Sequence, residues 1–376
     1  MNIVHQPPKA LLLLRLTVEN ASIISSHLTY GMPSPTAFVG FGHALQRKLN
    51  ATAAYQSLQI VGVGVACHAF YPQITQTNTY TPYQLNLTRH PVESDGGSAA
   101  LLEEGKGHFE VTLIFGLAGP AIEQLMQNND ASSQKNEFIN AFKHLAWQMR
   151  LAGGSVFPCA ETPHLIAWDS NKEAAQKRGR RLYSRLLPSF ILRDRSEILP
   201  THQAWLAEQP HYMATQVSTP TLLDALLDLS RINWQADSPR PSTQDDENTT
   251  SSDVETKTET INWQVRQRAA HQKGWLVPLP VGYGALTPLQ AAGTVTGARD
   301  DTSPVVFAET LLGVGEWLSP HRVNDLAELL WAYDAQQAQG VYRVIQPFRT
   351  DVQNFKPVAV ACIASTDATL NREEEF

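Results

Sequence analysis

The hydrophobic pattern predicts a buried strand, a polar loop and an amphipathic helix at the start of the chain. An apolar run from Ala10 to Leu16 has the length and composition of a buried strand. A polar, turn-rich loop from Ser25 to Pro35 follows it. Ser34 is a good N-cap for the next helix, and Pro35 suits its first position, where a missing N–H costs nothing. One face of this helix carries Phe38, Phe41, Leu45 and Leu49.

Further apolar runs predict the remaining elements of a first domain. Strands are indicated at Gln59 to Phe70, His108 to Leu117 and Leu151 to Phe157, and Glu137 to Gln148 has the apolar spacing of a helix. The intervening segment from Tyr71 to Lys106 is polar, and a structureless loop of that length is uncommon inside a domain, so we expect a β-hairpin. The order strand, helix, strand, strand, helix, strand is the ferredoxin-like pattern.

We therefore expect an α+β fold with more than one region. Residues 1–160 are predicted to form a ferredoxin-like, RRM-type domain, from which a thumb hairpin projects at about 71–107. Residues 161–335 are expected to form a mixed, partly helical second region, and residues 336–376 a C-terminal extension. Helices of the second region are predicted at Asn171 to Leu186, Thr201 to Glu208, Thr219 to Trp234 and Val323 to Tyr333.

The charge balance argues against a freestanding nucleic-acid binder, because such proteins are usually basic. The 376 residues carry a formal net charge of −7. Much of this charge comes from one segment at about 236–260, which has seven acidic residues, two basic ones and almost no apolar ones, a composition that predicts a disordered insertion. The rest of the chain is close to neutral. Composition thus permits RNA binding through a local basic strip without indicating it.

Cysteine usage and targeting signals indicate an ordinary cytoplasmic protein. Cys67, Cys159 and Cys362 stand far apart without a C-x-x-C pair, so we expect buried thiols in a reducing compartment and no metal site. The chain shows no N-terminal signal pattern and no apolar run long enough to cross a membrane. We expect no membrane contact and no cofactor.

Three stretches resemble one known family. LLLLRLTVENA, followed by ISSHLTYGMPSPTAFVGFGHALQRKL, is similar to the N-terminus of the Csy-two (Csy2) proteins, the Cas-five-type subunit of the type I-F CRISPR surveillance complex. FAET followed by GVGEWLSPHR, ending at Arg322, resembles the late signature of the family, and RLYSRLLPSF is a weaker third match. Together these matches anchor most of residues 10–335.

The resemblance implies a non-catalytic RNA-binding assembly subunit. Its expected partners are the 5′ handle of the CRISPR RNA (crRNA), which it would cap, and the large (Csy-one, Cas-eight-type) subunit of the Csy complex, a Cascade ribonucleoprotein for antiviral defence. It would also abut the adjacent backbone (Csy-three, Cas-seven-type) subunit. The family fold implies the same ferredoxin-like arrangement with a thumb. Direct contact with target double-stranded DNA stays an open alternative.

The first candidate RNA site spans the opening strand, loop and helix. Single-stranded RNA is held by cations on its phosphates, rings under its bases, and amide or hydroxyl groups on base edges and 2′-hydroxyls. Arg15 interrupts an apolar strand and must pair or face a groove. Alternatively these residues shape a loop, and Arg47 and Lys48 offset the helix dipole. The candidates are Arg15, Asn20, His27, Tyr30, Gly31, Ser34, His43, Arg47 and Lys48.

Two further basic groups are candidates for contact with nucleic-acid phosphate. Arg180, Arg181 and Arg185 lie on a predicted helix, although a charge run is often only a solvated surface. His321 and Arg322 follow Ser-Pro, a good helix start, and cations at a helix N-terminus are electrostatically unfavourable. These two residues therefore predict an anionic partner, either a phosphate or a facing carboxylate such as that of Glu316.

Enzyme signatures are poor. The sequence has no G-x-S-x-G, H-E-x-x-H or phosphate-loop motif and no carboxylates at metal-ligand spacing, so we expect no catalytic residues. The main alternative is a metal-independent endoribonuclease that processes CRISPR precursor RNA, because such an enzyme needs only a His, Tyr or Lys trio. A protein-only scaffold that touches no RNA is the third possibility.

Overall fold

The computed structural model describes residues 5–89, 92–127, 132–168, 182–209, 219–236, 263–323, 325–336, 340–350 and 360–361. Three predictions fall wholly or largely outside these ranges: the acidic insertion from residue 237 on, most of the Asn171 to Leu186 helix, and most of the C-terminal extension. No helix in the described ranges is long and apolar enough to span a membrane.

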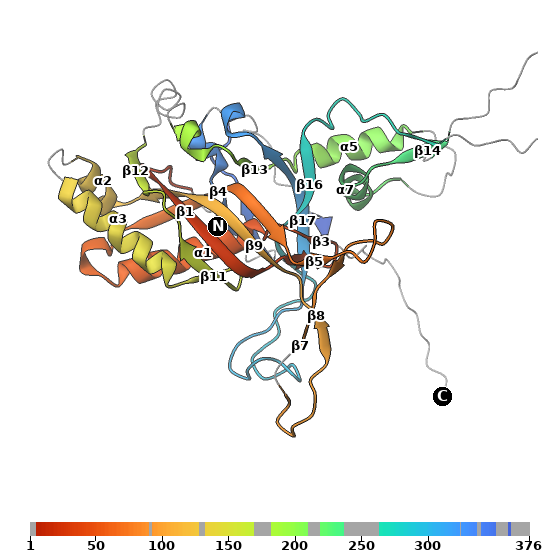
Figure 1. The fold of residues 1–376 in the computed structure, drawn as a ribbon, viewed down its shortest axis with the longest axis horizontal. Coiled ribbons are helices and arrows are strands. Elements are labelled where there is room, and N and C mark those ends of the chain that lie inside the picture. Colours follow the sequence, from red (N-terminus) through yellow and green to blue (C-terminus); the bar gives the residue numbers. More distant parts are fainter. Residues whose placement is uncertain are drawn as a thin grey trace, which may run out of the picture.

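The fold is α+β and is organised by one antiparallel sheet, with 12 strands in the described part of the chain (Figure 1). Its main order is β10-β11-β1-β9-β4-β13-β17-β16-β19-β18. The strands are β1 (Ala10–Ser22), β4 (Gln59–Pro72), β9 (Lys106–Ala118), β10 (Arg150–Leu151), β11 (Gly154–Pro158), β12 (His164–Ala167), β13 (Phe190–Asp194), β16 (Trp275–Ala285), β17 (Ala308–Leu318), β18 (Ala332–Gln336), β19 (Val341–Ile345) and β20 (Val360–Ala361).

Helices pack on the sheet in both the first and the second part of the chain. They are α1 (Pro35–Asn50), α2 (Pro120–Gln127), α3 (Ser132–Trp147), α5 (Ile198–Ala207) and α7 (Leu222–Ser230), with 3₁₀ turns η1 (Ala53–Tyr55), η2 (Pro320–Arg322) and η3 (Leu326–Leu329). In the first part of the chain, α1 and α3 lie on one face of the strands β11, β1, β9 and β4 (Figure 1). In the second part, α5 and α7 pack on β17 through Leu199, Leu226 and Leu312.

The first strand is buried on both faces, which explains its continuous apolar run. Leu12, Leu14 and Leu16 on one face belong to the core that also contains Phe38 of α1 and Phe142 of α3. On the other face, Leu11 and Leu13 pack in a second cluster with Leu186, Leu326 and Leu330. The predicted opening strand and helix are thus confirmed.

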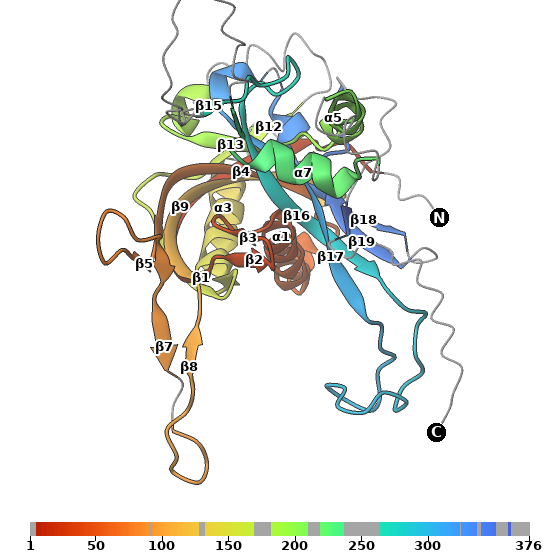
Figure 2. The same cartoon turned by 90° about the vertical axis from the view of Figure 1, so that its right-hand side faces the viewer.

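Small two-stranded ribbons extend from the body of the protein. The thumb predicted at 71–107 consists of the pair β5 (Ile74–Thr75) with β6 (Gln84–Leu85) and the pair β7 (Leu87–Arg89) with β8 (Leu101–Glu103). Figure 2 shows the thumb and the connection between β16 and β17 projecting toward the same side. Two more ribbons are β2 (Ile24–Ser26) with β3 (Thr29–Tyr30), and β14 (Trp234–Ala236) with β15 (Trp263–Val265).

The structure corrects three of the predicted elements. The helix predicted at Val323 to Tyr333 is wrong, because Trp331 exchanges backbone hydrogen bonds with Val63 of β4, and the chain then continues as β18. The helix predicted to reach Trp234 ends at Ser230. The strand predicted at Leu151 to Phe157 is two short strands, since a turn at residues 152–153 with positive φ separates them.

Candidate nucleic-acid interface

A cavity of about 370 Å³ lies under the loop that joins β1 to α1. Residues far apart in the chain form its walls: the loop itself, the later part of β4, the start of β13, the first half of β16 and the end of β17. We call it the aromatic cavity, because its lining includes Tyr30, Phe70, Phe190, Trp275 and Trp317.

The loop over the aromatic cavity is held in place by local hydrogen bonds. The ribbon β2–β3 closes with a hydrogen bond of 2.7 Å between the hydroxyls of Ser26 and Thr29. The backbone N–H of Gly31 donates to the carbonyl oxygen of Ile23 at 2.7 Å. Gly31 has a φ of +136°, which favours glycine. This geometry leaves the ring of Tyr30 64% exposed at the mouth of the cavity.

Ser34 ties this loop to the far part of the sheet. Its hydroxyl accepts a hydrogen bond from the backbone N–H of Thr36 at 3.2 Å, so it caps α1 as predicted. The same hydroxyl donates to the carbonyl oxygen of Pro280 in β16 at 2.8 Å. Ser34 therefore holds two walls of the aromatic cavity together.

The ring system of the cavity is suited to stacking on flat ligands. Phe190 and Trp275 pack edge to face with centroids 5.5 Å apart, and their rings are 48% and 57% exposed. Aromatic side chains that are partly exposed in a cavity are typical platforms for unstacked nucleobases. Cys67 also lines the cavity, and burial raises the pKa of its thiol to about 11, so the thiol stays neutral.

The structure brings together only part of the first predicted site. Tyr30 and Gly31 line the aromatic cavity, and His27 is exposed in the β2–β3 turn above it. Arg47 and Lys48 lie in the last turn of α1, about 20 Å along the helix axis from its start, so they belong to a different surface.

His43 is packed within the fold on the second half of α1. Its ring contacts the ring of Tyr333 edge to face at 6.0 Å. Burial lowers the pKa of His43, with a smaller contribution from the nearby charge of Arg47. The helix thus separates the predicted residues of the loop from those of its basic end.

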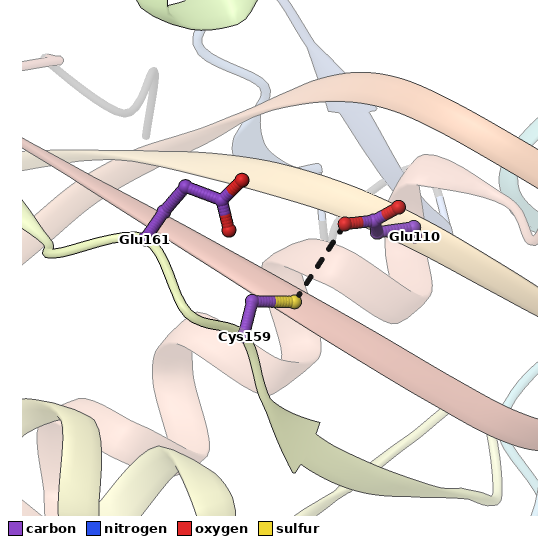
Figure 3. A group of neighbouring side chains, drawn as sticks. All are labelled: Glu110, Cys159 and Glu161. Carbon is purple, nitrogen blue, oxygen red and sulfur yellow. Dashed lines mark hydrogen bonds between the residues drawn. The ribbon is translucent and has the colours of Figure 1, made fainter.

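Arg15 forms structural ion pairs with two carboxylates. Its guanidinium lies 2.7 Å from Glu110 and 2.7 Å from Glu161. Together with Cys159, these two carboxylates form a cluster with the geometry of a metal site (Figure 3). Because the cationic guanidinium of Arg15 already bonds to both carboxylates and offsets one of their two charges, the cluster is engaged within the fold and does not favour a metal ion.

Asn20 serves to anchor the base of the thumb. Its φ of +57° places it in the left-handed region, which asparagine tolerates. The side-chain oxygen of Asn20 accepts a hydrogen bond from Gln73 at 2.8 Å, and Gln73 also contacts the ring of His108 at 2.9 Å. Asn20 therefore joins β1 to the strand that leads into the thumb.

The other predicted basic residues do not assemble into one site. Arg180 and Arg181 lie outside the described residues, whereas Arg185 is exposed and contacts His164. His321 and Arg322 are exposed on the 3₁₀ turn η2, where the ring of His321 bonds to the hydroxyl of Ser319 at 2.9 Å.

The carboxylate expected to face His321 and Arg322 is engaged elsewhere. Glu316 is 8% exposed and pairs with Arg195 at 2.7 Å. Arg195 also pairs with Glu197 at 2.8 Å. Glu316 of the GEW motif thus belongs to an ion-pair network that joins β13 to β17.

Sequence reasoning missed most of the aromatic cavity. Trp317 and Phe190 lie in the family-like stretches GVGEWLSPHR and RLYSRLLPSF, but neither of them was predicted as a site residue, and neither was Trp275. A usable signal existed, since Trp275 directly precedes an apolar strand and follows a polar segment. The pairing of these rings depends on sheet order, which local patterns do not reveal.

A second polar cluster, also missed, lies between α5 and α7. His202 is fully buried and bonds to Asp228 at 2.8 Å and to His271 at 2.8 Å. Arg266 also bonds to Asp228, at 2.5 Å. Burial raises the pKa of Asp228, but the hydrogen bonds from His202 and Arg266 outweigh it and leave the pKa lowered. The pKa of His271 is lowered, mainly by burial.

Comparison with known proteins agrees with the sequence motifs. A family model described as CRISPR-associated protein (Cas_Csy2) matches residues 11–344. The CRISPR-associated protein Csy2 of Pseudomonas aeruginosa (strain UCBPP-PA14) is 42% identical over 347 residues, which cover 90% of this chain and 96% of the relative. The resemblance seen in the sequence is confirmed: the chain belongs to the Csy2 family of CRISPR-associated proteins.

Proposed function

We propose that this protein is a non-catalytic RNA-binding subunit of a type I-F CRISPR surveillance complex, and that it caps the 5′ handle of the crRNA. The observation that carries the proposal is the aromatic cavity under the Tyr30–Gly31 loop. An unstacked base fits such a site physically, because rings supply stacking area and the nearby backbone supplies hydrogen-bond partners. In this arrangement the protein reads a constant RNA tag, while guide pairing reads the target.

The fold supports this proposal. The strands β11, β1, β9 and β4 lie side by side in the sheet in that order. Along the chain, these strands and the helices α1 and α3 follow one another as strand, helix, strand, strand, helix, strand. This is the order expected of a ferredoxin-like, RRM-type domain, a common RNA-binding scaffold. We propose the Csy-one large subunit and the adjacent Csy-three backbone subunit as protein partners, with the thumb at the backbone junction, in the cytoplasm.

Binding of the full chain to a labelled crRNA handle tests the proposal. Tyr30→Ala and Trp317→Ala should each weaken binding by about 1–3 kcal/mol if their rings stack on bases, which is roughly 5-fold to 150-fold. Tyr283→Ala is the matched control, since this ring is 50% exposed at the far end of β16, away from the cavity. Unchanged affinity for both cavity variants would contradict the proposal.

The second candidate, an endoribonuclease, is favoured by one observation. The hydrogen-bonded series Asp228, His202, His271 resembles the way a carboxylate orients a catalytic imidazole. We prefer the non-catalytic function because His202 is fully buried and its partners account for both ring nitrogens. Incubation with excess labelled precursor RNA separates the two: multiple turnovers that disappear in His271→Ala would establish cleavage.

A further inference from the structure

A second cavity, of about 450 Å³, lies beside the aromatic cavity, and Trp275 lines both. It is formed by the end of α7, the segment that follows it, the segment before β16 and the start of β16. We call it the basic cavity, because Arg231, Arg266 and Arg268 line it and none of its described lining residues is a carboxylate. Such a set of side chains creates a positive potential that attracts anions.

The three arginines differ in how their charge is balanced. Arg266 is held rigidly by Asp228 at 2.5 Å, and its guanidinium lies 5.2 Å above the ring centre of Trp205. Arg231 and Arg268 are exposed, and no salt bridge joins either of them to another described residue. Among the described residues, the basic cavity therefore has two cations without a salt bridge, on a wall that a buried network keeps in place.

Aromatic side chains flank the basic cavity. In the β14–β15 ribbon, Trp234 pairs with Val265 and Ala236 pairs with Trp263, so all four side chains lie on one face. The two tryptophan rings are 60% and 59% exposed. Cations next to exposed aromatic rings are the combination of side chains that holds single-stranded nucleic acid. The exposed tryptophans therefore favour a binding surface over a charged surface that only contacts solvent.

We propose that the basic cavity binds phosphate groups of the same RNA strand whose base enters the aromatic cavity. The inference rests on the proposed function, since it assigns a path to the RNA bound there. Trp275 stands between a wall of rings and a wall of arginines, so one strand can place a base on one side of it and its backbone on the other. The ligand class is therefore the phosphodiester backbone of single-stranded RNA.

The test uses the salt dependence of RNA binding by the full chain. The variant Arg231→Ser/Arg268→Ser should bind a labelled crRNA handle at least 10-fold more weakly at low salt. Each phosphate contact in a single strand contributes roughly 0.7 to the slope of log affinity against log salt, so losing two should flatten this slope by about 1.4. Arg299→Ser/Lys135→Ser, which removes two cations elsewhere, should leave the slope unchanged.

The outcomes separate the two proposals. If Tyr30→Ala weakens RNA binding but the double arginine variant keeps the wild-type slope, the phosphate site is wrong and the proposed function stands. If the wild-type chain does not bind the RNA, both are wrong. If a DNA strand of the same sequence binds more tightly and suffers the same loss, the assignment to RNA is overturned.

Discussion

The hydroxyl of Ser34 donates a hydrogen bond to the carbonyl oxygen of Pro280 across 2.8 Å, and so joins the start of α1 to the middle of β16. These residues are separated by most of the chain, yet they hold opposite walls of one cavity. A single side chain thereby combines a local task, capping a helix, with a long-range one. The two tasks can be tested by substitution.

Ser34→Ala should lower the free energy of unfolding by about 1–2 kcal/mol, since it removes an N-cap and one further hydrogen bond. Urea unfolding followed by tryptophan fluorescence measures the change. Ser34→Thr keeps the hydroxyl and should lose much less. Equal losses in the two variants would show that the hydroxyl contributes nothing.

Gly31→Ala tests whether backbone conformation shapes the mouth of the aromatic cavity. No atom lies within 4 Å of where its Cβ would stand, so a steric clash is not expected. The φ of +136° should nevertheless cost about 1–3 kcal/mol for any residue with a side chain. Gly40→Ala is the matched control: this glycine also has open space, but it lies inside α1, where alanine should stabilise the protein by up to about 1 kcal/mol.

Substitutions of Glu316 and Arg195 test whether the glutamate of the GEW motif stabilises the fold through its ion pair. Glu316→Ala removes one of the two carboxylates that pair with the mostly buried guanidinium of Arg195, while Glu197 stays bound to it, and should destabilise the protein by about 1–3 kcal/mol. Arg195→Met/Glu316→Leu removes both charges and should cost clearly less. Thermal unfolding of the two variants measures the difference. If the double variant is as unstable as the single one, packing rather than charge explains the stabilising effect of this contact.

Local signals predicted the elements that depend on local physics. The strand from Ala10 and the helix capped by Ser34 were predictable because an apolar run, an N-cap and a proline at the first helical position act within a few residues. The prediction for Val323 to Tyr333 failed because Trp331 pairs with Val63, a partner that no local pattern identifies.

At the candidate site, too, the residues of one local segment were predictable, and those that sheet order brings together were not. Tyr30 and Gly31 were found because they lie in one recognisable loop. Phe190 and Trp275 were not, because only the order of β4, β13, β17 and β16 brings them to that loop. Arg15 was correctly expected to need a partner, but its two carboxylates come from strands and loops that are distant in the sequence.

The carboxylate of Asp194 should make stability depend on pH. Burial raises its pKa, although its oxygen Oδ1 accepts hydrogen bonds from the hydroxyl of Ser196 at 2.6 Å and from the backbone N–H of Ser196 at 2.9 Å. The folded state thus holds the proton more tightly than the unfolded chain does. Its contribution to stability is complete below the unfolded pKa, about 4, and is lost as the pH rises through the higher folded pKa.

Asp194→Asn isolates this effect, because asparagine is neutral at every pH and its oxygen can still accept both hydrogen bonds. The free energy of unfolding of the variant, minus that of the wild type, should rise as pH increases from 4 and level off above the folded pKa. Paired urea titrations between pH 4 and 8 measure it. Asp300→Asn is the control: hydrogen bonds from Thr302 lower the pKa of that carboxyl, so its pH dependence falls below about pH 4 and its difference from the wild type should stay nearly flat across this range. A difference for Asp194→Asn that does not change with pH would mean that its carboxylate is not penalised by burial.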